Sequence, residues 1–288
     1  MRLAQIRQGD GLVAVIVENR TARLKGAWSV RPISEPWSLV DVIQRAEASG
    51  QSLSEFMLSH ATSPIEAELA IPLAPAEVWA SGCTYEASSS FRDAEHGTRE
   101  GFYAQVYSAD RPEIFFKGTA RHCVGHRAGI GIRSDSKFTA PEPELAVVLD
   151  SQGDVLGYTL ANDVSAWDIE RENALYLPQS KVYDACCALG PVMVTEDELA
   201  DPYNLEMTCT VTRDGKERYS GSTSTSRLHR KIETLIEYLS RSNHIPTGTV
   251  VLTGTGIIVP QEAALAPGDV VTIRVPEIGE LTNTAQIV

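Results

Sequence analysis

The stretch PEPELAVVLDSQGDVLGYTLAND, residues 141–163, limits the fold of this chain more than any other. Two apolar runs flank DSQGD, a sequence typical of a turn, so the stretch predicts a β-hairpin. Successive side chains of a strand point to opposite faces, and here both faces carry apolar residues. Strands of this kind are covered on both sides. The sequence therefore predicts a hairpin inside a layered, mostly β structure.

Three carboxylates stand at the open end of the predicted hairpin. Glu142 and Glu144 share a face at the start of the first strand, and Asp163 ends the second. Antiparallel pairing would bring all three together. Buried neighbouring carboxylates repel one another, and a divalent cation relieves that repulsion. Oxygen ligands without a nearby histidine or thiolate favour Mg²⁺, Mn²⁺ or Ca²⁺ over zinc. Surface charge at the strand ends is the alternative that spacing alone leaves open.

A hard cation held by three protein ligands keeps coordination positions for a substrate. A 2-keto acid would chelate it through the carboxylate and keto oxygens, and the positive charge would stabilise an enolate. The hairpin thus points to 2-keto acid chemistry if the carboxylates bind a metal.

The first part of the chain predicts a small N-terminal α/β domain. Residues 11–26 predict two short strands around a turn, and residues 38–50 predict a helix that ends at Gly50. A second helix is expected over residues 52–62, where Ser52 and Glu55 have the spacing of a capping pair. The proline-bearing segment 71–82 then favours a boundary, with domains at 1–73 and 74–288.

The larger part predicts an α+β fold with mostly β content. Apolar runs bounded by turn residues predict strands within 113–118, 205–218 and 269–279. One long helical stretch is expected over residues 226–242. A chain of 288 residues is long enough for both units.

Charge and cysteine usage exclude several classes of protein. The net charge of -13 disfavours nucleic acid or an anionic membrane surface as a partner. No run of apolar residues is long enough for a membrane span, and the first residues lack the core of a secretory signal, so a cytoplasmic protein is expected. Five cysteines without CxxC spacing argue against a disulfide framework and a structural zinc site. His122 and His126 are four apart, but in a predicted loop, which disfavours a second metal site.

Five ordered motifs resemble the fumarylacetoacetate hydrolase family over roughly residues 81–288. They are PEIFFKG, PEPELAVVL, GYTLANDVSAWD, SKVYDACCALGPVMVT and VVLTGTGIIVP. The resemblance implies a rolled β-structure that holds Mg²⁺ or Mn²⁺, with Glu142, Glu144 and Asp163 as the metal ligands. It also implies that Lys181 is the active-site lysine, that Thr255 lies in a loop touching the substrate carboxylate, and that the protein is a homodimer or homotetramer.

The resemblance leaves the reaction open, because the family contains hydrolases, decarboxylases, isomerases and dehydratases. Hydrolase members carry a histidine and a glutamate in a short lid segment after an Asn-Tyr pair. Here residues 83–100 read CTYEASSSFRDAEHGTRE, with serine or alanine where that histidine would be. Only His96, with Glu95 or Glu100, would substitute for it. The missing water-activating base weakens the hydrolase interpretation.

The lid region, residues 102–118 and residues 170–191 resemble instead the sugar-acid branch of the family. The resemblance implies a Mg²⁺-dependent dehydratase that converts a 2-keto-3-deoxy-pentonate, of arabinonate or xylonate type, to 2-oxoglutarate semialdehyde in non-phosphorylative sugar catabolism. Two alternatives remain: a metal-dependent C–C hydrolase of acylpyruvate-type or 2,4-diketo-3-deoxy sugar acids, and a protein that only binds 2-keto acids. An intact lysine beside the acidic triad speaks against the last.

In a dehydratase, a base removes a proton from C3 and the enolate expels the C4 hydroxyl. Lys181 is the candidate for the proton transfers, since a neighbouring cation and burial lower the pKa of a lysine. Further candidate side chains lie in the lid, in EIFFKG and around ENALYLPQSK; for each, a solvated surface position is the alternative. Glu172 and Thr255 are catalytic candidates, and Arg92, Lys117, Gln179 and Thr255 are substrate-binding candidates, with Glu86, Glu95 and Arg171 as further possible contacts.

Overall fold

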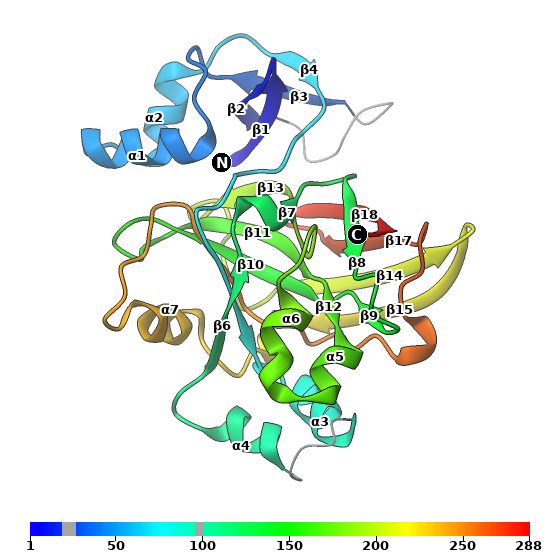
Figure 1. Ribbon diagram of the computed structural model, residues 1–288. Coiled ribbons are helices and arrows are strands. Elements are labelled where there is room, and N and C mark those ends of the chain that lie inside the picture. The colour runs from blue at the N-terminus through cyan, green and yellow to red at the C-terminus, as the bar shows by residue number, and fades with distance from the viewer. Residues whose placement is uncertain (19–26, 96–100) are drawn as a thin grey trace.

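The computed structural model describes residues 1–18, 27–95 and 101–288, without the side chains of residues 91–95 and Phe102. The strands of the described residues form two large sheets and one short pair, and the helices are short, so the predicted α+β fold with mostly β content is confirmed. Figure 1 shows a small N-terminal unit above a larger body.

The N-terminal unit is an antiparallel sheet covered by two helices. Its elements are β1 (Arg2–Gln8), β2 (Gly11–Val17), β3 (Trp28–Pro32), α1 (Leu39–Ser49), α2 (Leu53–His60) and β4 (Ile65–Ala67). Both predicted helices are confirmed: Gly50 ends α1 in a left-handed conformation at φ 68°, and Ser52 and Glu55 form the capping box of α2. The second strand expected within residues 11–26 falls largely on residues 19–26, outside the described residues.

The large sheet continues from the N-terminal unit into the body. Among the described residues its order is β4-β3-β2-β1-β13-β11-β10-β16-β5-β6, and β7 pairs with β13. The strands of the body are β5 (Val78–Gly82), β6 (Glu113–Gly118), β7 (Cys123–Val124), β10 (Pro143–Leu149), β11 (Val155–Asp163), β13 (Cys187–Thr195) and β16 (Thr249–Leu252). In the joining ladder Arg2 is opposite Val194 and Leu3 is opposite Met193. The domain boundary near residue 73 stays a prediction.

A second sheet packs against β11 and β13 of the first. Its order is β15-β14-β17-β18-β8, with strands β8 (Gly129–Ile132), β14 (Glu206–Arg213), β15 (Lys216–Ser224), β17 (Val270–Val275) and β18 (Gly279–Ile287). Buried side chains from both sheets form one core, which includes Leu160, Val194, Val271 and Leu281. A short pair, β9 (Thr139–Ala140) and β12 (Ser165–Ala166), lies beside it.

The helices of the body surround one end of the large sheet (Figure 1). They are α3 (Glu86–Glu95), α4 (Phe102–Ser108), α5 (Trp167–Glu172), α6 (Leu177–Lys181) and α7 (Ile232–Ser240), with 3₁₀ turns at Ala120–His122, Ala174–Tyr176, Thr225–Arg227 and Gln261–Ala263. The long helix expected over residues 226–242 is therefore wrong in its first part. The backbone N–H of His229 donates to the carbonyl of Thr84 at 2.9 Å, and this tertiary bond replaces a helical one.

The predicted hairpin is β10 and β11, and it is confirmed. Pro143 is opposite Asn162 and Glu144 is opposite Ala161, while the N–H of Asp163 donates to the carbonyl of Glu142 at 2.9 Å. All seven residues of β10 are buried. The register thus places the three carboxylates at the same end of the hairpin.

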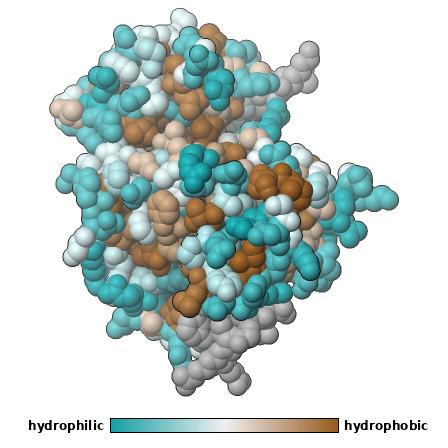
Figure 2. Space-filling view, in the orientation of Figure 1, coloured by the Kyte–Doolittle hydropathy of each residue, from teal (hydrophilic) through white to brown (hydrophobic). Residues whose placement is uncertain are grey.

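The surface of the body mixes hydrophobic and hydrophilic patches on the face seen in Figure 2. The most exposed large hydrophobic side chain among the described residues is Leu175, between α5 and α6, at 83%. No helix in the described part of the chain is long and apolar enough to cross a membrane.

Candidate active site

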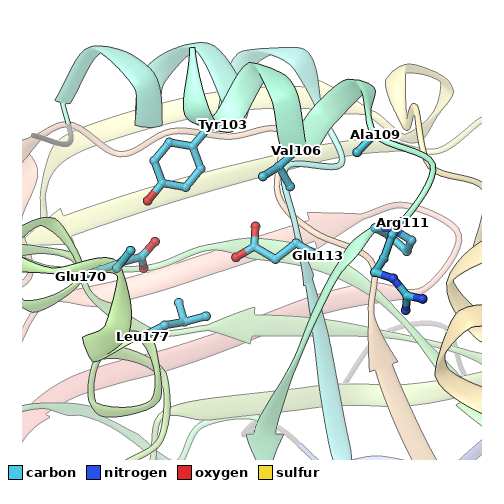
Figure 3. Close-up of a pocket in the computed structure, with 9 residues that line it drawn as sticks. Tyr103, Val106, Ala109, Arg111, Glu113, Glu170 and Leu177 are labelled. Carbon is cyan, nitrogen blue, oxygen red and sulfur yellow. The ribbon is translucent and has the colours of Figure 1, made fainter. Parts of the chain in front are cut away.

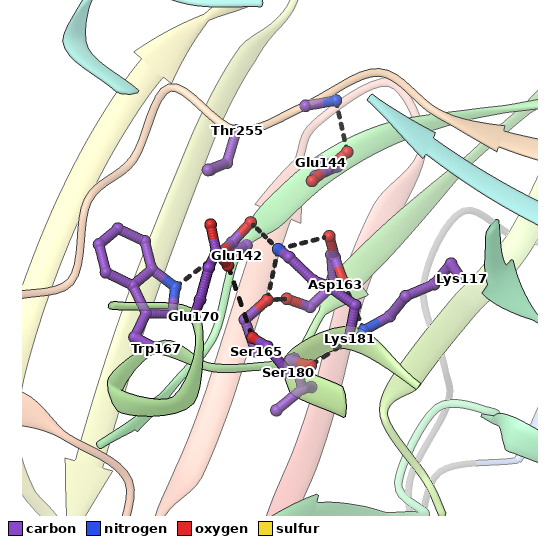
Figure 4. A network of polar contacts seen from close by, with 12 residues as sticks. Lys117, Glu142, Glu144, Asp163, Ser165, Trp167, Glu170, Ser180, Lys181 and Thr255 are labelled. Atoms are coloured by element: carbon purple, nitrogen blue, oxygen red, sulfur yellow. Dashed lines mark hydrogen bonds and ion pairs between the residues drawn. The ribbon is translucent and has the colours of Figure 1, made fainter. Parts of the chain in front are cut away.

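The three carboxylates of the hairpin converge on one buried point. Ligand oxygens of Glu142, Glu144 and Asp163 all lie within 4.8 Å of one another, and all three side chains are buried. Figure 4 shows them at the ends of β10 and β11, beside the loop that carries Thr255. Surface charge at the strand ends, the alternative left open by the sequence, does not describe these residues.

Hydrogen bonds from neighbouring elements fix the two glutamates. The backbone N–H of Gly254 donates to Oε2 of Glu144 at 2.5 Å, and the indole N–H of Trp167 donates to Oε1 of Glu142 at 2.6 Å. Gly254 has φ 93°, and a side chain added there would collide with Thr84. A glycine is therefore required for the loop to approach Glu144 so closely.

Two buried lysines flank Asp163 on either side. Nζ of Lys181, at the end of α6, donates to Glu142 at 3.0 Å, to Asp163 at 3.0 Å and to the Ser165 hydroxyl at 2.6 Å. Nζ of Lys117, on β6, lies 2.5 Å from the other carboxylate oxygen of Asp163 and donates to the carbonyl of Val164 at 2.9 Å. The ammonium groups thus neutralise part of the negative charge.

The charges perturb one another in both directions. Burial raises the pKa of Glu144 well above its usual value, and Asp163 and Glu142 raise it further. Burial also raises the pKa of Asp163, but Lys117 and then Lys181 lower it by more. For Lys181, burial lowers the pKa, yet Asp163 and Glu142 raise it above its usual value. The lowered pKa expected for Lys181 rested on a bound cation, which would compete with the ammonium for the same carboxylates.

The donor set fits a hard divalent cation. Three carboxylates against two ammonium groups leave one negative charge in a site removed from water. Within the described residues Glu144 faces two other carboxylates and accepts a single hydrogen bond, from Gly254. All three prospective ligand groups are oxygens, which suits Mg²⁺ or Mn²⁺. His122 and His126 lie outside this cluster. Each uses Nδ1 to accept a backbone N–H, from Thr119 and Thr282 respectively.

Two adjoining cavities lie beside the carboxylates, and Glu170 lines both. The inner cavity holds only about 20 Å³, room for about one water molecule. It is lined by Ser81, Gly82, Cys83, Ser88, Phe115, Glu142, Asp163, Trp167, Glu170, Lys181 and Thr255. The outer cavity is larger, at about 340 Å³, and α4 covers it. In Figure 3, Tyr103 on α4, Glu113 on β6 and Glu170 on α5 border this outer cavity.

The structure brings some of the predicted site residues together and leaves others apart. Lys181 and Thr255 line the inner cavity with the carboxylates. Lys117 is fully buried behind Asp163 and lines neither cavity, while Glu172 and Gln179 are exposed and line neither. Their assigned roles stay predictions.

Other predicted contacts lie at the margins of the site. Arg171 sits over the Phe138 ring, 4.8 Å from its centroid, and Glu86 lines a separate cavity. The side chains of Arg92 and Glu95, and residues His96 and Glu100, lie outside the described part of the chain.

Sequence reasoning missed three residues of the site: Ser165, Trp167 and Glu170. Trp167 and Glu170 are three apart on α5, so both turn inward on one face, whereas the predicted Glu172 turns outward. The apolar Trp167 was the available signal, because the residue three positions after a buried aromatic shares its face. The Ser165 hydroxyl donates to the carbonyl of Asp163 at 2.8 Å and accepts from Lys181.

The fold and the carboxylate cluster define a class of protein. Residues 89–286 match the family model described as fumarylacetoacetate (FAA) hydrolase C-terminal, and the chain belongs to this family. The resemblance stated from the sequence motifs is confirmed.

Two curated relatives and one solved structure are more specific. The chain is 50% identical over 213 residues to the 2-dehydro-3-deoxy-D-arabinonate dehydratase of Saccharolobus solfataricus, covering 73% of this chain and 72% of the relative. It is 44% identical over 233 residues to the probable 2-keto-3-deoxyxylonate dehydratase of Haloferax volcanii, covering 81% and 77%. A structure of 2-keto-3-deoxy-D-arabinonate dehydratase complexed with magnesium and 2,5-dioxopentanoate superimposes with a TM-score of 0.85 at 37% identity, covering 100% of this chain and 99% of that one.

Proposed function

We propose that this protein is a Mg²⁺-dependent dehydratase that converts a 2-keto-3-deoxy-pentonate, of arabinonate or xylonate type, to 2-oxoglutarate semialdehyde in non-phosphorylative sugar catabolism. The observation that carries the proposal is the buried cluster of Glu142, Glu144 and Asp163 with Lys181 at its edge. The two dehydratases that the chain resembles at 50% and 44% identity support the reaction. The compound in the superimposed structure, 2,5-dioxopentanoate, is 2-oxoglutarate semialdehyde.

The three carboxylates would hold the Mg²⁺, with Gly254 and Trp167 fixing the two glutamates. The chemistry that the cation supplies when bound is electrostatic, since it withdraws electron density from the 2-keto group and so makes the C3 protons more acidic. Lys117 keeps Asp163 in place from the far side, through the 2.5 Å contact. We therefore assign Lys117 to positioning rather than to substrate contact.

Substrate would lie across the two cavities. The carboxylate and keto oxygens would point toward the inner cavity next to Thr255, and the hydroxylated carbons would reach past Glu170 into the outer cavity of about 340 Å³. The inner cavity is too small for the whole molecule, so the outer one is required. This orientation places C3 and C4 between Lys181 and Glu170.

Lys181 is the proposed base for C3. Its Nζ lies beside the carboxylate cluster, and hydrogen bonds to Glu142, Asp163 and Ser165 fix its direction. The proton it accepts from C3 allows the C4 hydroxyl to depart. A neutral amine is needed for this step, and a cation bound to the same carboxylates would lower the pKa of Lys181.

Glu170 is the proposed proton donor to the departing hydroxyl. It is buried at 4% exposure, it lines both cavities, and the Ser180 hydroxyl donates to it at 3.5 Å. The C4 hydroxyl takes one proton and leaves as water, with a C3=C4 double bond remaining. A proton shift from C5 to C3 and ketonisation through C4 then give the aldehyde, so one water is lost overall. Glu172, the carboxylate named from sequence, is exposed instead.

The protein is further proposed to act in the cytoplasm as a homodimer or homotetramer. Family resemblance supports the oligomer, and the exposed Leu175 at 83% offers an apolar contact to a second copy.

Product analysis tests the proposed function. Purified protein with Mg²⁺ is given 2-keto-3-deoxy-D-xylonate, its D- and L-arabinonate counterparts and acetylpyruvate, each with and without EDTA. We expect 2-oxoglutarate semialdehyde from at least one sugar acid, and none with EDTA. Pyruvate and acetate from acetylpyruvate would identify a hydrolase, and unchanged substrates with intact binding would identify a binding protein.

A further inference from the structure

Helix α4, which covers the outer cavity, has little stability of its own. It spans only Phe102–Ser108, its N-cap is Gly101 without a side-chain cap, and its last turn contains no basic residue. Isolated helices of this length do not persist in water, so other parts of the molecule must hold it in place. Its position matters because Tyr103, Val106 and Ala109, at intervals of three residues, line the outer cavity.

The carbonyl groups at the end of α4 are satisfied in two ways. The Ser108 hydroxyl donates to the carbonyls of Ala104 and Gln105 at 3.0 and 3.3 Å, and the N–H of Ala109 also donates to Gln105. The remaining carbonyls at this end have a distant partner. The Arg230 guanidinium donates to those of Val106 at 3.0 Å, Tyr107 at 2.8 Å, Asp110 at 3.5 Å, and Ala109.

Arg230 is therefore a C-terminal cap supplied from more than a hundred residues further along the chain. A positive charge at a helix C-terminus also complements the partial negative charge of the carbonyls that have no partner within the helix. The neighbouring residue adds a second contact, because the His229 ring stacks on Tyr107 at 4.3 Å between centroids and an angle of 25°. The N–H of His229 donates to the carbonyl of Thr84, which fixes this segment to the body.

We propose that Arg230 is a positioning residue for substrate recognition: it holds α4 so that Tyr103 and Val106 form the wall of the cavity that takes the hydroxylated end of the substrate. Figure 3 shows both side chains above Glu113 and Glu170. This inference rests on the proposed function for the identity of the ligand. Arg230 does not line the cavity itself, so it acts through α4.

This role predicts that loss of Arg230 affects the binding of short and long ligands differently. A ligand that binds at the carboxylate cluster and is too short to reach the outer cavity, such as oxalate with Mg²⁺, makes no use of α4. A 2-keto-3-deoxy-pentonate depends on the wall that α4 provides. Loss of Arg230 should thus weaken binding of the sugar acid selectively.

The experiment compares Arg230→Met, Arg230→Lys and Arg274→Gln in the full-length protein. Arg230→Met keeps the apolar stem and removes the donors, Arg230→Lys keeps a charge, and Arg274 is an exposed arginine on β17 that serves as the control. Hydrogen exchange of residues 103–109 is measured in the free protein. Calorimetry with Mg²⁺ gives the affinity for oxalate, and steady-state kinetics give KM and kcat for the sugar acid. If the sugar acid is not converted, calorimetry gives its affinity as well.

For Arg230→Met we expect hydrogen exchange in residues 103–109 to be about tenfold faster. The sugar acid should bind about tenfold more weakly, seen mainly as a raised KM. Both factors correspond to the loss of one anchoring interaction. The affinity for oxalate should change less than about twofold, because oxalate does not use the interaction that is lost. Arg230→Lys should lie between, and Arg274→Gln should match the wild type.

Unchanged exchange in Arg230→Met would overturn the proposal, and so would equal losses for oxalate and the sugar acid. If the wild type binds the sugar acid without converting it, the proposed function fails while exchange and the two affinities still decide the role of Arg230. Wild-type protein that binds oxalate but not the sugar acid overturns both.

Discussion

Replacing Glu144 by glutamine tests the metal site without removing volume. The amide keeps an oxygen that accepts the N–H of Gly254, and it removes one charge from a side chain that is 1% exposed. With Lys117 and Lys181 both positive, the cluster then carries no net charge instead of one negative charge. The variant thus separates the stability of the protein itself from its affinity for the cation.

The two effects on stability have opposite signs. In EDTA, Glu144→Gln should unfold at the same temperature as the wild type or higher, because the substitution removes one of three buried carboxylates that repel one another. With Mg²⁺ at a hundred times its Kd, the wild type gains about 2.7 kcal/mol. That gain raises the Tm by roughly 5–10 °C. The variant should show no Mg²⁺-dependent rise.

Differential scanning calorimetry in EDTA and across a Mg²⁺ titration measures both effects. Glu262→Gln, at an exposed position in the Gln261–Ala263 turn, is the matched control and should keep the full Mg²⁺ response. A Glu144→Gln protein that is less stable in EDTA, yet retains its Mg²⁺-dependent rise in Tm, would refute the assignment of Glu144 as a ligand.

Three further substitutions address the reaction and the fold. Lys181→Ala should lower kcat by about 10²-fold or more, which is the scale of a positioned acid or base. The Mg²⁺-dependent rise in Tm should persist, and normal turnover would remove Lys181 from the mechanism. Glu170→Gln should also lower kcat by about 10²-fold or more with oxalate affinity unchanged, and wild-type kcat would exclude it as the proton donor. Asp269→Asn should lower stability at neutral pH by about 1.5–3 kcal/mol, since the buried carboxylate accepts two charged hydrogen bonds, at 2.7 and 2.8 Å, from the partly exposed Arg213. Burial raises the pKa of Asp269, but Arg213 lowers it below its usual value, so this stability is present at neutral pH and disappears as the pH falls through the folded-state pKa. Denaturation curves of the two proteins should converge in acid, and a constant difference would contradict the ion-pair explanation.

The hairpin and its carboxylates could be predicted because their information is local. Alternation of side chains and one turn fix which residues of β10 and β11 share a face, and the register follows from the turn. The capping boxes of α1 and α2 are local in the same sense. These parts of the fold needed no knowledge of distant residues.

Other parts depend on contacts that no local pattern shows. The inward face of α5 holds Glu170 rather than Glu172, because a helix of six residues takes its orientation from packing around Trp167. Lys181 would be a solvated lysine by local pattern alone, yet three distant partners bury it. The helix predicted over residues 226–242 is shorter in the structure, because the backbone N–H of His229 bonds to the distant carbonyl of Thr84.

The ladder between β1 and β13 has a consequence for how the protein unfolds. Strand β13 lies between β1 and β11, and β11 carries Asp163. Removing the N-terminal unit would leave the backbone of Val192–Thr195 as an unpaired sheet edge with apolar side chains, which is a template for aggregation. The N-terminal unit should therefore melt in the same cooperative transition as the catalytic body, and a fragment that begins at residue 74 should precipitate rather than fold alone.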